Sequence, residues 1–167
     1  KVNKLYSNII WSQKDNFLDV PTDCPQRDER LGWTADAQVF AKAAMYNFDV
    51  RRFFSKWLND LSADQYPNGT VPYIVPDVLD GSEEATSAAY GDAAVIIPWE
   101  MYRIYGDKKI LERQIDSMIA WVEYMHGYGE EEYLWLGHTQ LGDWLHLDRL
   151  DNPDEIRRRD DFIASAY

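Results

Sequence analysis

The chain has 167 residues, of which 46% are hydrophobic and 14% aromatic, so it is long enough for one ordinary domain with an apolar core. Its formal net charge of −12 excludes the basic surface that nucleic acids and anionic membranes require. Its single cysteine, Cys24, excludes an internal disulfide. The sequence contains no run of about 18 apolar residues, so it predicts no membrane-spanning helix.

The first third of the chain predicts three helices. Apolar residues mark the first helix over about residues 2–15. We expect Thr34 to cap a second helix over about residues 35–48, and Asp49 to cap a third. The apolar side of the second helix is predicted to consist of Val39, Phe40, Ala43 and Ala44. The third helix is amphipathic, with apolar residues at Val50, Phe53, Phe54, Trp57, Leu58 and Leu61.

Residues 64–89 interrupt the helical pattern. Proline and glycine recur there at Pro67, Gly69, Pro72, Pro76 and Gly81. These residues predict a long connection, and a loop of this length inside a compact domain is usually functional. The candidates for contacts within it are Tyr66, Tyr73 and Asp77.

A second pair of helices follows this connection. The segment over about residues 92–105 is apolar nearly all round, so we expect it to be buried, with Pro98 kinking it or shifting its start. Gly106 ends that helix, and Asp107 is predicted to cap the next, which reaches about residue 126. The expected apolar stripe of this last helix consists of Leu111, Ile115, Met118, Val122 and Met125. A buried helix followed by an amphipathic one, twice over, is typical of helical hairpins in two layers.

The last part of the chain is mixed. Residues 133–136 predict a short strand or an extended segment, and residues 142–144 predict a loop. Asp160 and Asp161 are interpreted as caps of a sixth helix of barely two turns, which stops at Tyr167. We therefore expect the chain to be truncated at its C-terminus.

The loop after the first helix gathers four carboxylates, two guanidinium groups and an indole. Its sequence from Asp23 to Asp36 is Asp-Cys-Pro-Gln-Arg-Asp-Glu-Arg-Leu-Gly-Trp-Thr-Ala-Asp. Sugar-cleaving sites need one protonated acid, ionised carboxylates for hydroxyl groups and a flat apolar face for the ring. Simpler interpretations exist as well, since Asp36 would interact favourably with a helix dipole and Trp33 could be a core residue.

The string from Asp23 to Gln38 closely resembles the signature of the bacterial α-L-rhamnosidases of glycoside hydrolase family 78, and Gly142-Asp143-Trp144 is similar to a Gly-Asp-Trp segment of these enzymes. The resemblance implies an all-α fold, with residues 1–167 forming the N-terminal half of an (α/α)6 barrel built from helical hairpins, which is part of a catalytic domain. It also implies that terminal α-L-rhamnosyl linkages of glycosides or oligosaccharides are hydrolysed with inversion of configuration.

By this resemblance, Glu29 is the general acid that protonates the glycosidic oxygen. The base that activates water comes from the later half of the barrel, so the isolated chain should be inactive. The residues that resemble substrate contacts are Asp23, Arg27, Trp33, Asp36, Asp143 and Trp144. The three acids resemble ligands of sugar hydroxyls, and the two tryptophans resemble apolar walls, one of them under the rhamnose methyl group.

Three alternative functions stay open at this stage. The same aromatic and acidic residues could bind a sugar without cleaving it, and a related helical-barrel glycosidase could act on another sugar. A helical interaction scaffold needs a regular repeat, and none is visible in the sequence.

We expect no metal and no other cofactor. His138 and His146 lack a third ligand and helical spacing, and the acidic stretch over residues 148–161 lacks the spacing of an EF-hand. We also expect the exposed apolar faces of a half barrel to promote self-association.

Overall fold

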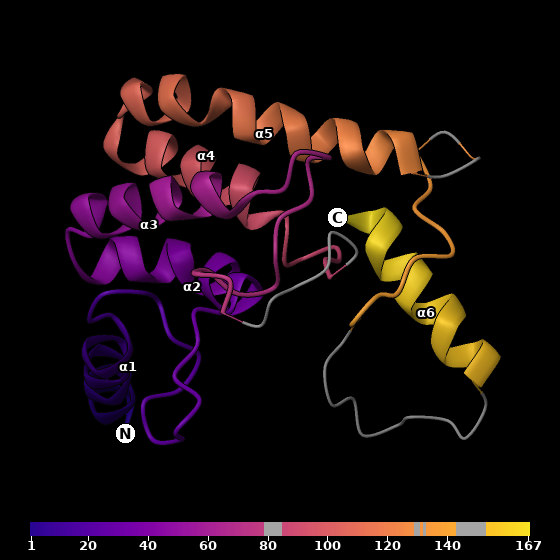
Figure 1. Ribbon diagram of the computed structural model, residues 1–167. Coiled ribbons are helices and arrows are strands. Elements are labelled where there is room, and N and C mark those ends of the chain that lie inside the picture. Colours follow the sequence, from indigo (N-terminus) through magenta and orange to yellow (C-terminus); the bar gives the residue numbers. More distant parts are fainter. Residues whose placement is uncertain (79–84, 129–130, 132, 143–152) are drawn as a thin grey trace.

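The computed structural model describes residues 1–78, 85–128, 131, 133–142 and 153–167, and within these residues it contains six helices and no β-strand. The helices are α1 (Val2–Asn16), α2 (Thr34–Asn47), α3 (Arg51–Asp64), α4 (Ala93–Tyr105), α5 (Lys108–Tyr128) and α6 (Pro153–Ala166) (Figure 1). The predicted all-α fold is confirmed. None of these helices is both long and apolar enough to cross a membrane.

Helices α2 to α5 form two antiparallel hairpins that lie side by side (Figure 1). Short turns at residues 48–50 and 106–107 join the helices of each hairpin at one end of the molecule. Gly106 ends α4 in the left-handed conformation with φ of 68°, as the sequence predicted. The motif loop (residues 17–33) and the described parts of the long connection (residues 65–78 and 85–92) reach the opposite end of these helices.

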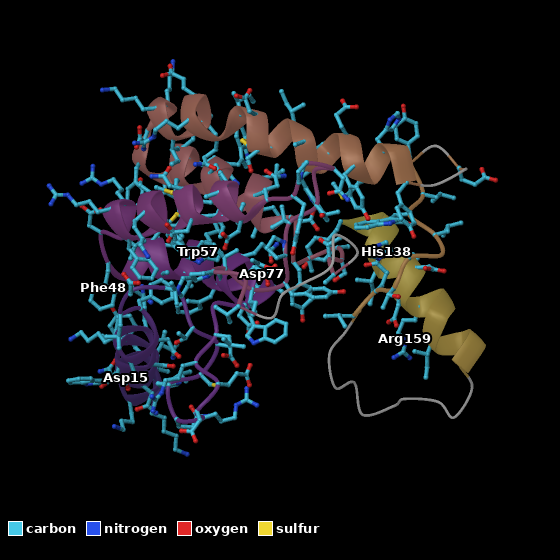
Figure 2. All side chains as sticks on the ribbon, in the orientation of Figure 1. Asp15, Phe48, Trp57, Asp77, His138 and Arg159 are labelled. Atoms are coloured by element: carbon cyan, nitrogen blue, oxygen red, sulfur yellow. The ribbon has the colours of Figure 1, made fainter. Side chains whose placement is uncertain are left out.

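The core lies between the two hairpins, where α4 packs on α2, α3 and α5. The predicted face of α3 is buried, and its largest side chains are Phe54, Trp57, Leu58 and Leu61. Ile97 and Met101 of α4 and Trp121 of α5 complete the centre of this core. Trp57 of α3 is labelled in Figure 2. Each such side chain stabilises the fold by about 1.5–3 kcal/mol relative to an exposed position.

The predicted apolar faces of α2 and α5 are only partly correct: Ala44 is buried, and Phe40, Leu111 and Met125 pack against the core while partly exposed. Val39 of α2 and Val122 of α5 are exposed at 74% and 46%. The buried residues are Thr34, Ala37, Gln38, Ala41, Ala44 and Met45 of α2, and Ile110, Gln114, Ser117 and Trp121 of α5. Small and polar residues occupy these faces because small side chains allow close helix packing and buried polar groups find partners. The Gln114 amide oxygen, for example, accepts a hydrogen bond from the Ser62 hydroxyl at 2.6 Å.

Helix α4 is central, yet the prediction that it is buried all round is wrong for Trp99, which is 47% exposed. Pro98 is buried inside the helix, which begins at Ala93.

Some of the predicted helix caps agree with the structure and others do not. Thr34 is the first residue of α2 and its hydroxyl donates to the Tyr73 carbonyl at 2.9 Å, so its predicted capping role is wrong. Asp49 precedes the N-cap of α3 and accepts a hydrogen bond from the Arg51 amide at 3.3 Å. Asp107 accepts one from the Lys109 amide at 3.0 Å, at the start of α5. Both aspartates satisfy amides at helix starts, so the prediction for Asp107 is confirmed. The prediction for Asp49 is wrong by one residue, because the N-cap of α3 is Val50.

The sixth helix begins earlier than predicted. It starts at Pro153, so Asp160 and Asp161 lie inside it and are not its caps. Proline suits the first turn of a helix because the amides there have no partner within the helix. Residues 133–136 form no strand, and Trp135 is buried, with its amide donating to the Ser165 hydroxyl at 3.1 Å.

Candidate active site

The motif loop is anchored where it leaves α1. Phe17 stacks on Phe53 with ring centroids 4.5 Å apart, and it meets Phe54 edge-on at 5.7 Å. Further along, the Asp23 amide donates to the Leu31 carbonyl at 3.2 Å, which closes the charged part of the loop on itself. The backbone that carries the charged side chains is therefore held in place by aromatic packing at Phe17 and by this hydrogen bond.

The end of the motif loop is joined to the long connection by backbone hydrogen bonds. The Val75 amide donates to the Gly32 carbonyl at 2.9 Å, and the Thr34 amide donates to the Tyr73 carbonyl at 2.9 Å. A Cβ atom on Gly32 would overlap the Val75 carbonyl oxygen, so this close approach requires glycine. Two segments far apart in the sequence thus form one unit beside the start of α2.

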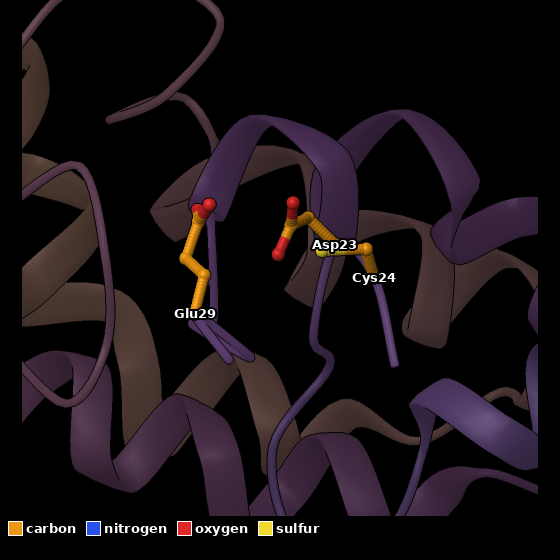
Figure 3. A group of neighbouring side chains, drawn as sticks. All are labelled: Asp23, Cys24 and Glu29. Carbon is orange, nitrogen blue, oxygen red and sulfur yellow. The ribbon is translucent and has the colours of Figure 1, made fainter. Parts of the chain in front are cut away.

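Arg27 lies among three acceptors of the charged motif. Its Nη2 contacts Asp23 Oδ2 at 2.8 Å and Glu29 Oε2 at 3.4 Å, and its Nε donates to Cys24 Sγ at 3.1 Å. Figure 3 shows the side chains of Asp23, Cys24 and Glu29 close together. The hydrogen bonds to Cys24 and Asp23 raise the pKa of Arg27, so its positive charge is secure.

Both carboxylate oxygens of Glu29 are engaged. Oε1 accepts a hydrogen bond from Trp33 Nε1 at 2.6 Å, while Oε2 faces Arg27. The Glu29 side chain keeps 29% of its surface exposed, so a ligand can reach it. The neighbouring Asp28 and Arg30 are exposed, and neither takes part in this arrangement.

Asp36 joins the cluster from the first turn of α2. Desolvation of its carboxyl group raises the pKa of Asp36, and the negative charges of Asp23 and Glu29 raise it further. Asp23 contributes a second feature, since its Oδ1 is buried and has no hydrogen-bond partner among the described residues. The structure therefore brings together all five of the predicted site residues that it describes, namely Asp23, Arg27, Glu29, Trp33 and Asp36.

An aromatic cluster backs the carboxylates. The ring centroid of Trp33 lies 6.4 Å from that of Tyr73 and 6.0 Å from that of Tyr90, and the ring centroids of the two tyrosines are 5.1 Å apart. Burial, together with the charge of Asp36, raises the pKa of Tyr90 to about 12. The sequence analysis missed Tyr90, because no charged motif surrounds it and only the high aromatic content of the chain pointed to such residues.

The other sequence candidates have separate positions. Tyr73 belongs to the aromatic cluster, whereas Tyr66 donates a hydrogen bond to the Asp77 carboxylate at 2.8 Å within the long connection. Asp143 and Trp144 lie outside the residues that the structure describes.

The structure offers little to a metal ion at this site. Asp23, Cys24 and Glu29 place possible ligand atoms within 4.8 Å of one another. Arg27, however, already binds all three, and its positive charge would repel a cation. His138 is buried, with its ring nitrogens near the Thr139 carbonyl and the Tyr124 hydroxyl, as expected of a packed histidine.

Known proteins resemble this chain in sequence and in fold. Residues 1–167 match the family described as the bacterial alpha-L-rhamnosidase 6 hairpin glycosidase domain. An alpha-L-rhamnosidase of Formosa agariphila is 44% identical over 146 residues, which cover 87% of this chain and 15% of that protein. One from an Alteromonas species is 47% identical over 145 residues, which cover 87% of this chain and 15% of that protein.

A solved structure shares the fold. The Streptomyces avermitilis alpha-L-rhamnosidase complexed with L-rhamnose superposes with a TM-score of 0.86 at 40% identity, covering 99% of this chain and 15% of that one. The chain thus spans about 15% of the length of these relatives. With its whole length matched and its fold shared, the chain belongs to the bacterial α-L-rhamnosidase family, within the six-hairpin glycosidase domain.

Proposed function

We propose that this chain supplies the general-acid side of the active site of an α-L-rhamnosidase, which releases terminal α-L-rhamnose by hydrolysis with inversion. The observation that carries the proposal is the Glu29 carboxyl group, held between Trp33 and Arg27 beside two further carboxyl groups. The Streptomyces avermitilis enzyme, whose structure was solved in complex with L-rhamnose, supports the choice of sugar.

In this mechanism Glu29 gives its proton to the glycosidic oxygen as the bond from that oxygen to the sugar carbon breaks. The electron pair of the broken bond stays on the leaving oxygen, and Glu29 becomes a carboxylate. A second carboxylate, from a part of the enzyme beyond this chain, activates a water molecule on the opposite face of the sugar.

The surrounding residues bind the sugar. Asp23 has a buried oxygen without a partner, and a sugar hydroxyl would satisfy it. Asp36 accepts from a second hydroxyl, and Arg27 holds the acids in place. Trp33 and Tyr90 offer an apolar wall to the ring and its methyl group. Asp143 and Trp144 are proposed as further contacts on the basis of the sequence resemblance.

The test is hydrolysis of an aryl α-L-rhamnoside by the full-length protein with Glu29→Gln. We expect kcat to fall by about 10²- to 10⁴-fold, because a general acid contributes that much. Asp28→Asn is the matched control, since this carboxylate is adjacent in sequence but exposed. Proton NMR of the first product should show the β-anomer if the reaction inverts configuration.

Activity that persists in Glu29→Gln and collapses in Asp28→Asn would move the acid to Asp28 and overturn the proposal. A full-length protein that cleaves another sugar and leaves aryl α-L-rhamnosides intact would overturn the choice of substrate.

A further inference from the structure

Trp33 meets the candidate acid with the edge of its ring as well as offering its face to a sugar. Its Nε1 lies 2.6 Å from Glu29 Oε1, shorter than the usual 2.9–3.0 Å of N–H···O hydrogen bonds. Hydrogen bonds to ionised groups are both shorter and stronger than neutral ones. The sequence resemblance assigned this tryptophan only to an apolar wall.

The indole is the fixed partner of this pair. Trp33 forms an antiparallel bridge with Ile74, and its ring packs against Tyr73 and Tyr90. Glu29 stands in the motif loop, and its other partner, Arg27, has a side chain that is 60% exposed. The position of the Glu29 carboxyl group is therefore set mainly by the indole N–H.

We infer that Trp33 is a positioning residue for the general acid: its N–H holds Oε1 of Glu29 so that Oε2 delivers the proton. Oε2 lies 3.4 Å from Arg27 Nη2, a longer contact than that of Oε1, and it is the oxygen left for the leaving group. As it gives up its proton, the bond between the sugar and the leaving oxygen breaks and Glu29 becomes a carboxylate. The N–H of Trp33 then stabilises the charge that appears. This inference rests on the proposed role of Glu29.

A positioning role and a wall role differ in how they depend on the leaving group. A wall binds the sugar, so its loss affects all rhamnosides alike. Proton delivery matters most when the leaving group is a poor one, such as phenol, and little when it is 2,4-dinitrophenol, which departs without a proton. The ratio of kcat values on the two aryl α-L-rhamnosides therefore isolates the contribution of the N–H.

The experiment measures kcat and KM of the full-length protein and of Trp33→Phe on phenyl and 2,4-dinitrophenyl α-L-rhamnoside. We expect kcat on the phenyl substrate to fall about 10- to 100-fold, the size of a hydrogen bond to a charged group. On the dinitrophenyl substrate kcat should fall less than about 3-fold. Equal losses on both substrates would overturn the inference and leave Trp33 as a wall alone.

Two further variants serve as a control and as a second test. Trp99→Phe is the same substitution at an exposed position of α4, and it should leave both kcat values unchanged. If Trp33→Phe fails to fold, replacing the indole of Trp33 by benzothiophene keeps the ring and substitutes sulfur for the N–H. This variant must show the same selective loss on the phenyl substrate, and unchanged kcat values would overturn the inference.

Glu29→Gln on the same two substrates separates the inference from the proposed function. A selective loss in Glu29→Gln without one in the Trp33 variants would overturn the positioning role alone. No selective loss in Glu29→Gln would overturn the role of Glu29 as acid, and with it the role of Trp33.

Discussion

Arg27 shows how one side chain organises the charged motif. Its guanidinium group reaches Asp23, Cys24 and Glu29 at once, and the planar fork of arginine makes three such contacts possible. Lysine has the same charge but a single ammonium group. We expect Arg27→Lys to lower kcat/KM on an aryl α-L-rhamnoside about 10-fold or more, through misplaced carboxylates.

The control for this prediction is Arg30→Lys. Arg30 is exposed, and its Nε donates only to the Pro25 carbonyl, at 3.1 Å, among the contacts described. Steady-state kinetics of both variants in the full-length protein provide the measurement. A loss as large in Arg30→Lys would contradict the prediction that the contacts of Arg27 are the cause.

The raised pKa of Tyr90 predicts that this tyrosine of the site ionises only at strongly alkaline pH. Its pKa is raised to about 12, because burial and the negative charge of Asp36 disfavour the phenolate. The folded-state pKa lies above the unfolded value of 10.0, so this tyrosine's contribution to stability is fully present below pH 10.0 and is lost as the pH rises through about 12. Ultraviolet titration of phenolate absorbance should show a late step that becomes smaller in Tyr90→Phe, because burial raises the pKa of Tyr73 as well. Tyr6→Phe is the matched control, because Tyr6 is exposed on α1 and lies outside the aromatic cluster.

At the residue scale, the sequence predicted part of the site. The five described residues of the charged motif meet because they are close in sequence and lead directly into α2. Tyr73 and Tyr90 reach Trp33 only because the long connection folds back on the motif loop. A single sequence contains no signal for that long-range contact, so the role of Tyr90 could not be predicted.

At the scale of elements, the contact between the long connection and α5 is especially close. Gly91 lies against the ring of Trp121, and a Cβ atom there would overlap the ring. The Trp121 Nε1 also donates to Asp92 Oδ1 at 3.1 Å, and Asp92 Oδ2 accepts from the Ala89 amide at 2.6 Å. The loop that presents Tyr90 is thus fixed to α5 through a buried tryptophan.

Gly91→Ala should therefore destabilise the domain by about 1–3 kcal/mol, the usual range for overpacking. Gly127→Ala is the matched control, because Gly127 lies in α5 and no atom of the described residues comes within 4 Å of a new Cβ. There the same change should stabilise the protein by up to about 1 kcal/mol through helix propensity. Urea unfolding of the two variants measures the contrast, and equal effects would contradict the close packing at Gly91.

The helices themselves were easier to predict than their orientation. The apolar residues of α3 form one stripe, and the buried face of this helix lies along that stripe, as predicted. On α5, Ile115 and Val122 continue an apolar pattern that lies at the surface, while Gln114 and Ser117 are buried. Periodicity finds apolar positions, but it does not distinguish a face covered by these helices from one that they leave open.

At the scale of the whole molecule, several large apolar side chains are exposed on each of the helices α1 and α5. Those on α1 are Val2, Leu5, Tyr6, Ile9 and Trp11, and those on α5 include Ile115, Ile119 and Val122. Apolar patches of this kind drive association in water. We expect the isolated 167-residue chain to self-associate, which light scattering over a concentration series will detect.

Paired substitutions on α5 test the cause. Ile115→Lys with Ile119→Lys should shift the chain towards monomer. Glu112→Gln with Asp116→Asn changes the net charge by the same +2 on exposed positions of the helix and should not. A wild-type chain that stays monomeric at high concentration would contradict the prediction, and so would equal effects of the two pairs.

The short turns at residues 48–50 and 106–107 stand at the end of the hairpins opposite the candidate active site (Figure 1). Around Gly106, no atom in the part of the chain that the structure describes lies within 4 Å of where a Cβ would stand. An affinity handle inserted at this turn would immobilise the domain with its carboxylates facing the solution, open to glycosides too large to diffuse beneath a surface-bound protein.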